Sequence, residues 1–180
     1  MLGPTLETER LILRPPTPED YEPYCAFMAL DATRFIGGPQ LKSVAWRGLA
    51  SVIGAWTLRG HSMFSYIEKA TGRWVGRGGT WTPEGWPGNE VGWAVIPEAQ
   101  RRGYAREASV AAMDWAFETL GWQEVIHCID PANAPSIAVA HSLGSRLLRP
   151  GVKPPAPFAD IVWDIYGQTR DEWRARKFSR

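Results

Sequence analysis

The sequence is poor in cysteine, in excess charge of either sign and in long apolar runs, and each shortage excludes a class of protein. Cys25 and Cys128 are far apart and lack metal-ligand spacing, so we expect no disulfide framework and no metal. A net charge of +1 argues against nucleic acid as the main partner. No apolar run approaches membrane-spanning length. The first residues lack the basic and apolar regions of a signal peptide, so the default expectation is a cytoplasmic protein without a membrane partner.

What is present is the composition of an ordinary globular protein of 180 residues, 44% hydrophobic and 22% charged. A chain of this length buries roughly 70% of its unfolded surface in one core. We therefore expect a single domain over residues 7–166, followed by a basic tail at 167–180. Ten tryptophans are unusual for this length, and several fall in segments that resemble loops, where they are candidates for lining a pocket.

The pattern of apolar, polar and turn-forming residues predicts a mixed architecture. Strands are expected at residues 10–14, 63–68, 74–81, 90–96, 124–129, 146–149 and 159–166, and helices from residue 17, over 43–58, over 102–120 and over 134–143. A hairpin followed by alternating strands and helices gives a mixed sheet with helices on both faces.

The segment at residues 91–108 carries the most specific signal. A β-branched run stops at Pro97, and two arginines and a glycine precede an alanine-rich helix. The first amides of a helix lack partners within it, and the helix dipole favours negative charge there. Gly103 lets a ligand approach the backbone, and Arg101 and Arg102 add forked donors suited to phosphate oxygens. We predict a site for a phosphate ester, specifically a diphosphate; the alternative is an ordinary turn with two solvated arginines.

The spacing Gln100-Arg101-Arg102-Gly103-Tyr104-Ala105 resembles the acyl-CoA signature of the GCN5-related N-acetyltransferases (GNAT), which runs Gln/Arg-x-x-Gly-x-Gly/Ala. Asn133 and Ser136 form an Asn-x-x-Ser pair in the next strand–helix unit, as in that family. The resemblance extends over about residues 7–166 and points to the branch of ribosomal-protein N-terminal acetyltransferases. It implies an α/β (α+β) fold with a mixed, mostly antiparallel central sheet of about seven strands. Helices would cover both faces, and the sheet would splay between its fourth and fifth strands.

The resemblance further implies acetyl-CoA as cosubstrate and an amine acceptor as the second partner. The pantetheine would pair with the backbone of Trp93, Ala94, Val95 and Ile96. The diphosphate would lie on the amides of Arg101, Arg102, Gly103, Tyr104 and Ala105, with Gln100 at the turn. Asn133 and, as the weaker candidate, Ser136 would contact the pantetheine or cap the helix beside it. For Asn133, simple N-capping of the following helix is an equal alternative.

Glu90 is the candidate general base, because it begins the central strand where similar enzymes often carry a glutamate that acts through water. A carboxylate of ordinary pKa about 4.3 needs an apolar environment, or a water relay, to act near neutral pH. Trp81, Trp86 and Trp93 are close enough in sequence to supply that environment. The alternative is a rim carboxylate in a salt bridge. A backbone amide near Val95 is the candidate donor to the thioester oxygen.

The general acid is where the sequence departs from the family. Aligning Leu143-Gly144 with the family pattern puts Ala140 at the position where many members have a tyrosine. His141 or Ser142 is a possible substitute, the direction of Tyr104 is open, and water is a further donor, because a thiol of pKa about 8.5 leaves readily.

The acceptor expected from these features is a protein N-terminal α-amine, whose pKa of about 7.7–8.0 leaves about a tenth of it neutral at pH 7. The loops at residues 35–41 and 82–89 should form its pocket, with Phe35 and Trp86 favouring an apolar acceptor. Two alternatives stay open: a small-molecule amine such as an antibiotic or polyamine, and a non-catalytic acyl-CoA-binding sensor. The sequence leaves open whether the chain is a monomer or a homodimer.

Overall fold

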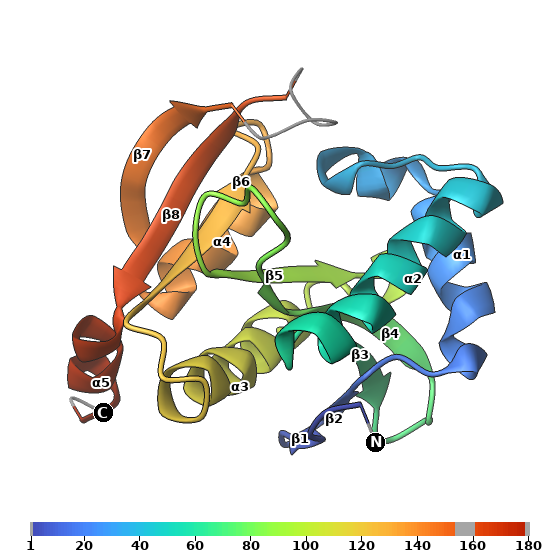
Figure 1. Cartoon of the computed structure of the whole chain (residues 1–180), viewed down its shortest axis with the longest axis horizontal. Helices are drawn as coiled ribbons and strands as arrows, with labels where there is room; N and C mark the ends of the chain where they lie inside the picture. The colour runs from blue at the N-terminus through green and yellow to red at the C-terminus, as the bar shows by residue number, and fades with distance from the viewer. Residues whose placement is uncertain (1, 154–160, 179–180) are drawn as a thin grey trace.

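The computed structural model describes residues 2–153 and 161–178, and its centre is one eight-stranded sheet (Figure 1). The strands run in the order β1-β2-β3-β4-β5-β6-β8-β7, and only β5 and β6 are parallel. Their bounds are β1 Leu6–Glu7, β2 Leu11–Arg14, β3 Met63–Glu68, β4 Trp74–Trp81, β5 Glu90–Val95, β6 Glu124–Ile129, β7 Arg146–Val152 and β8 Trp163–Thr169. The expected mixed, mostly antiparallel sheet is confirmed. The extra strand is β1, whose two residues are too few to show a periodic pattern.

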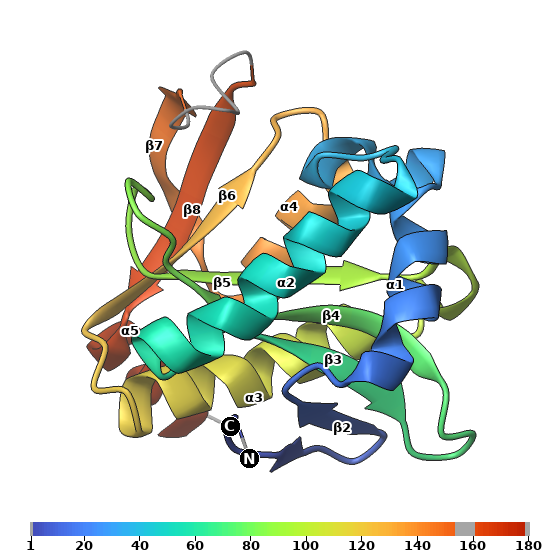
Figure 2. The same ribbon diagram turned by 45° about the vertical axis from the view of Figure 1, so that its right-hand side comes forward.

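The described residues form five α-helices around the sheet: α1 Tyr21–Met28, α2 Lys42–Arg59, α3 Tyr104–Glu118, α4 Ala134–Leu143 and α5 Arg170–Phe178. Figure 2 shows α1 and α2 on one face, with α3 and α4 on the other. Helix α3 packs through Tyr104 and Ala108 against a core that includes Leu13 and Phe64. It begins two residues later than expected because Gly103 has φ +83, outside helical geometry.

The sheet opens between β5 and β6. These strands pair only where Glu90 lies opposite Ile126, and beyond that point they diverge (Figure 1). The splay expected between the fourth and fifth strands is therefore present. It lies between β5 and β6 because the short strand β1 shifts the numbering by one. The carboxyl-terminal half of β5 thus has a partner, β4, on one side only.

The carboxyl-terminal segment is part of the packed domain. The boundary expected at residue 166 falls inside β8, and α5 follows at once. Trp173 is buried against Phe117 of α3, and its indole Nε1 donates to Asp114 Oδ1 at 2.7 Å. Trp173 is the buried apolar residue that docks this otherwise highly charged helix. Because most residues of the segment are charged, its composition resembles that of a separate tail. The start of the strand expected at 159–166 lies outside the described residues.

None of the described helices combines the length and the apolar character required to cross a membrane.

Candidate active site

The free edge of β5 presents a defined set of backbone groups. Ile96 N–H donates to Val75 O at 3.0 Å, so in the antiparallel ladder alternate residues turn their backbone groups toward β4. Ala94 and Ile96 are thereby paired with β4, whereas Trp93 and Val95 face the opening toward β6. The Val95 carbonyl accepts from Gln100 Nε2 at 3.1 Å. Four residues, 93–96, were expected to offer backbone groups to a ligand. Of these, Trp93 has both its N–H and its C=O directed into the opening, and Val95 has its N–H.

The turn between β5 and α3 has an unusual backbone. A short 3-10 helix, Pro97–Ala99, leads to Arg101 with φ +59, and Gly103 with φ +83 follows. Within residues 2–153 and 161–178, Arg101 is the only non-glycine residue with positive φ. Such a conformation costs about 1–2 kcal/mol for a residue with a Cβ, and strain of this kind gathers at ligand-binding turns. The first amides of the 15-residue helix α3 follow directly.

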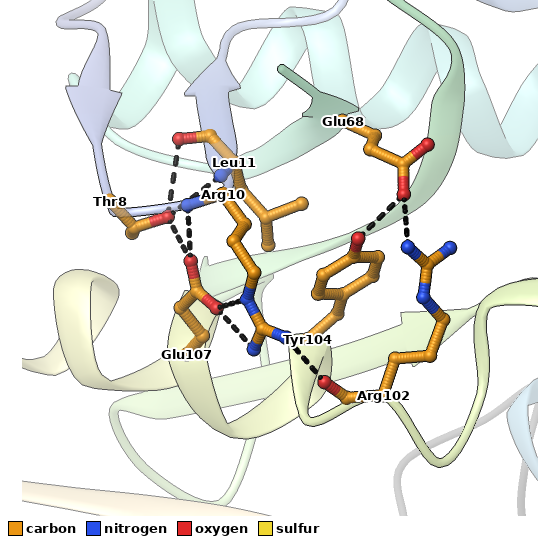
Figure 3. A network of polar contacts seen from close by, with 7 residues as sticks. All are labelled: Thr8, Arg10, Leu11, Glu68, Arg102, Tyr104 and Glu107. Carbon is orange, nitrogen blue, oxygen red and sulfur yellow. Dashed lines mark hydrogen bonds and ion pairs between the residues drawn. The ribbon is translucent and has the colours of Figure 1, made fainter. Parts of the chain in front are cut away.

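The side chains of Arg102 and Tyr104 join a network of polar contacts with residues of β3 and of the segment before β2 (Figure 3). The guanidinium of Arg102 lies 2.8 Å from Glu68, and the Tyr104 hydroxyl donates to the same carboxylate at 2.5 Å. The Tyr104 ring lies between the guanidinium groups of Arg10 and Arg102, at 4.8 and 4.7 Å from its centroid.

The same network fixes the charge state of Glu68 and the path of the backbone. Hydrogen bonds, first from Tyr104 and then from Thr71, hold the pKa of the Glu68 carboxyl below its ordinary value. Arg10 also donates to the Arg102 carbonyl at 2.9 Å, which ties the turn to the start of β2. The Tyr104 phenol, whose direction the sequence left open, donates to Glu68, and the Arg102 side chain, expected to offer its donors to phosphate, forms an ion pair with the same carboxylate. Arg101 is exposed and makes no hydrogen bond or ion pair within the described chain.

Glu90 is the buried carboxylate of the site, with 7% of its surface exposed. Its Oε2 accepts from Trp86 Nε1 at 2.5 Å, and its Oε1 accepts from the Cys128 amide at 3.2 Å. Burial raises the pKa of the Glu90 carboxyl to about 7, although these two donors and the charge of Arg77 act in the opposite direction. No cation of the described residues lies within salt-bridge distance of Glu90, contrary to the alternative of a rim ion pair.

The tryptophans near Glu90 have different roles. Trp86 both shields the carboxylate and donates to it, while packing on Trp163 at a ring distance of 4.9 Å. Trp81 is the cross-strand partner of Glu90 in the β4–β5 ladder. The Trp93 ring lies against the imidazole of His127 at 4.9 Å. Only Trp86 therefore contacts the carboxylate through a hydrogen bond.

A cavity of about 940 Å³ connects these features. It reaches Glu90 and Trp86 at the start of β5, and Asn133 and Ser136 at the start of α4. Both loops expected to form a pocket, at residues 35–41 and 82–89, contribute to its wall. Cys128 also lines it, and burial followed by the adjacent Glu90 charge raises the pKa of its thiol. The carboxylate and the open edge of β5 thus face one continuous space.

A chain of buried polar side chains, not foreseen from the sequence, lies beside the opening between β5 and β6. His127 Nδ1 lies 2.6 Å from the Val91 carbonyl, and its Nε2 lies 2.9 Å from Ser145 Oγ, which also accepts from Gln168. The contact with a carbonyl requires Nδ1 to carry the proton, so Nε2 accepts from the serine hydroxyl. Burial lowers the pKa of His127 to about 4, so the ring is neutral. A lone histidine in the apolar stretch Glu124–Ile129 was its only signal in the sequence.

The start of α4 favours the capping interpretation of Asn133. Its Oδ1 accepts from the Ser136 amide at 3.3 Å, although both residues also line the cavity. Farther along α4, Ala140 is fully buried and Ser142 donates to the Val139 carbonyl. His141 is exposed, and its ring meets Tyr166 edge-on at 5.4 Å. Neither His141 nor Ser142 lines the cavity, so neither is placed as a general acid.

Comparison with known proteins supports one family. Residues 10–146 match the family described as an acetyltransferase (GNAT) domain. The chain is 33% identical over 87 residues to YnaD, an uncharacterized N-acetyltransferase of Bacillus subtilis, and the match spans 47% of this chain and 50% of that protein. The matched part of this chain therefore corresponds to about half the length of that relative.

Solved structures extend the match to the whole fold. An acetyltransferase from Agrobacterium tumefaciens superposes with a TM-score of 0.83 at 34% identity, covering 93% of this chain and 95% of the other. A putative ribosomal-protein-serine acetyltransferase from Vibrio cholerae superposes with a TM-score of 0.76 at 21% identity, covering 92% and 97%. The second is a likeness of fold alone.

Proposed function

The chain belongs to the GNAT acetyltransferase family, and we propose that it transfers acetyl from acetyl-CoA to a primary amine, specifically the α-amine of a protein N-terminus. The observation that carries this proposal is the position of Glu90, a buried carboxyl of pKa about 7 in the cavity that also reaches the open edge of β5. A base of that pKa is matched to an α-amine of pKa about 7.7–8.0, and far less to a lysine amine of about 10.4.

The free edge of β5 would hold the pantetheine arm. The N–H and C=O groups of Trp93 are oriented to pair with its amides, as an added strand would. The N–H of Val95 would donate to the thioester carbonyl, where negative charge develops during transfer. At the far end, the first amides of α3 and the exposed side chain of Arg101 would hold the diphosphate. Arg102, through its ion pair with Glu68, and Gln100, through its hydrogen bond to the Val95 carbonyl, would hold the turn in place.

Proton transfer is assigned to Glu90. The carboxylate accepts a proton from the incoming ammonium, directly or through one water, and the neutral amine then attacks the thioester carbon. A C–N bond forms and the C–S bond breaks, and the second proton of the nitrogen passes through water to the departing thiolate, which leaves a neutral amide and a free thiol. Water is sufficient because the pKa of such a thiol is about 8.5. Trp86 and the Cys128 amide orient the carboxylate throughout.

A small-molecule amine is the second candidate acceptor, because about 940 Å³ lies within the volume range of small-ligand pockets. A polyamine fits less well, since Arg77 places positive charge in the same cavity.

An acceptor screen tests the proposal. Thiol release from acetyl-CoA would be followed with a free N-terminal peptide, the same peptide with a blocked N-terminus and one lysine, an aminoglycoside, and spermidine. We expect release with the free peptide at least tenfold faster than with the blocked one. Release with the aminoglycoside or spermidine alone would reject the N-terminal acceptor, and no release with any acceptor despite CoA binding would reject the activity.

A further inference from the structure

Arg77 is a cation in the cavity whose donors are mostly unused. It lies in the middle of β4, and its Nη1 donates to the Met63 sulfur at 2.8 Å. Its guanidinium lies over the ring of Tyr24, 5.4 Å from the centroid. Its Nε is buried and has no hydrogen-bond partner among the described residues.

This situation is costly for the folded protein. A thioether is a weak acceptor, and the buried Nε–H of this half-buried guanidinium costs free energy unless an anion or water satisfies it. Two other arginines show the contrast: Arg14 pairs with Asp20 at 2.7 Å, and Arg59, on the wall of the same cavity, pairs with Glu84 at 3.0 Å. No carboxylate of the described residues lies within salt-bridge distance of Arg77.

Arg77 is not placed to serve a diphosphate on the turn before α3. Its contacts with Tyr24 and Met63 put it on the sheet face that α1 and α2 cover, whereas α3 packs on the opposite face (Figure 2). Glu90 shares the cavity with Arg77. In the β4–β5 ladder, Arg77 is opposite Ala94 and Trp81 is opposite Glu90, so the two backbones are four residues apart, roughly 13 Å. Because Ala94 and Glu90 are an even number of residues apart on β5, the side chains of Arg77 and Glu90 lie on the same face of the sheet, and both line the cavity.

We propose that Arg77 binds a carboxylate of the acceptor, so that the preferred substrate is an amine that also carries an acidic group a few bonds away. The inference rests on the proposed function, because it requires the amine to lie at Glu90. Two N–H groups of a guanidinium match the two oxygens of a carboxylate, which would fix the acceptor at its second end. A peptide with an acidic residue next to its N-terminus and a small amino acid or dipeptide with a free carboxylate share this chemistry.

Matched acceptors on the wild-type protein give the first test. The amidated peptide Ala-Asp-Ala-Ala would be compared with Ala-Asn-Ala-Ala, and the dipeptide Ala-Ala would be compared with its amide. We expect kcat/KM to be about ten- to hundredfold higher for the acidic member of at least one pair, the factor typical of a charge-assisted hydrogen bond. A preference within the first pair identifies a peptide source, and one within the second pair a small molecule.

Substitution gives the second test. Arg77→Met keeps the length of the stem without the charge and should abolish the preference by raising KM for the acidic acceptor, while KM for acetyl-CoA stays unchanged. Arg77→Lys should retain part of the preference. Arg73→Met, the control, removes an exposed arginine just before β4 and should leave the preference for the acidic acceptor unchanged.

The outcomes separate the two proposals. Equal kcat/KM for acidic and amide acceptors in the wild type would overturn the carboxylate site and leave N-acetyl transfer standing. A preference that survives in a folded Arg77→Met variant would also overturn it. Thiol release with none of these acceptors would overturn both.

Discussion

The imidazole Nδ1 of His127 lies 2.6 Å from the Val91 carbonyl oxygen, at the point where the backbone of β6 would otherwise pair with β5. Ile126 N–H donates to Asn89 O at 2.8 Å, and a continued parallel ladder would next join Cys128 N–H to Val91 O. Because His127 occupies that carbonyl, the Cys128 amide donates to Glu90 instead. One buried ring therefore ends the pairing of β5 with β6 and supplies the proposed base with a donor.

Glu90 and His127 should give opposite pH dependences of stability. The folded-state pKa of Glu90 is raised from 4.5 to about 7, so the folded protein binds more protons than the unfolded chain and its stability falls as pH rises through that window. The pKa of His127 is lowered from 6.5 to about 4, so stability falls as pH drops from 6.5 toward 4. Each shift corresponds to about 3 kcal/mol, and the two effects oppose each other in the wild type.

Single substitutions should expose each slope. His127→Asn keeps a donor for Val91 and should cost about 1–3 kcal/mol at neutral pH, with stability falling further from pH 4.5 to 7. Glu90→Gln should leave only the opposite slope. Urea unfolding at pH 5 and pH 7.5 measures both, and two variants whose stability changes with pH as the wild type does would refute this assignment of charge states.

The two arginines of the turn should differ in what they support. Arg101→Glu should weaken CoA binding at least tenfold and change the free energy of unfolding by less than about 0.5 kcal/mol, because the side chain is exposed. Arg102→Glu sets a carboxylate beside Glu68 and should reduce both affinity and stability. Calorimetry and thermal melting separate these effects, with Arg73→Glu as the control. Unchanged affinity in the double reversal at 101 and 102 would remove the anion site.

Helix α5 should contribute to the stability of the whole domain. Trp173→Ala should destabilise it by about 3–5 kcal/mol, the cost of removing a buried aromatic side chain, and should leave Asp114 without this donor. Arg174→Ala breaks only the surface pair with Glu118 at 2.9 Å and should cost less than about 1 kcal/mol. Equal, small effects in urea unfolding would mean that the segment after residue 166 is a dispensable tail.

What the sequence could predict was local. The β5–turn–α3 unit depends on Pro97, Gly103 and an alanine-rich helix, whose effects are confined to neighbouring residues, and its structure follows that expectation. The burial of Glu90 was also foreseeable, because Trp86 is only four residues away.

What could not be predicted depends on contacts between distant segments. Arg102 and Tyr104 face Glu68, more than 30 residues earlier in the chain, so no local pattern shows that the second arginine is committed to an ion pair. His127 looks like part of an apolar strand until β7 and β8 bring Ser145 and Gln168 to it. In the sequence, Arg77 is an ordinary arginine of a strand. Only the structure places it on the cavity wall with a buried Nε that has no hydrogen-bond partner among the described residues.

The most direct test of the account is turnover by Glu90→Gln, measured as thiol release across pH 5.5–9 with CoA affinity measured in parallel. Glu124→Gln is the matched control, since Glu124 begins β6 as Glu90 begins β5 but is exposed. Wild-type kcat/KM should rise with pH through about 7 as the carboxyl ionises. The Glu90→Gln variant should lose about 10²–10⁴-fold in turnover and bind CoA within twofold of wild type. A variant that keeps wild-type turnover and pH profile would contradict the central claim that this buried carboxylate takes the proton from the amine.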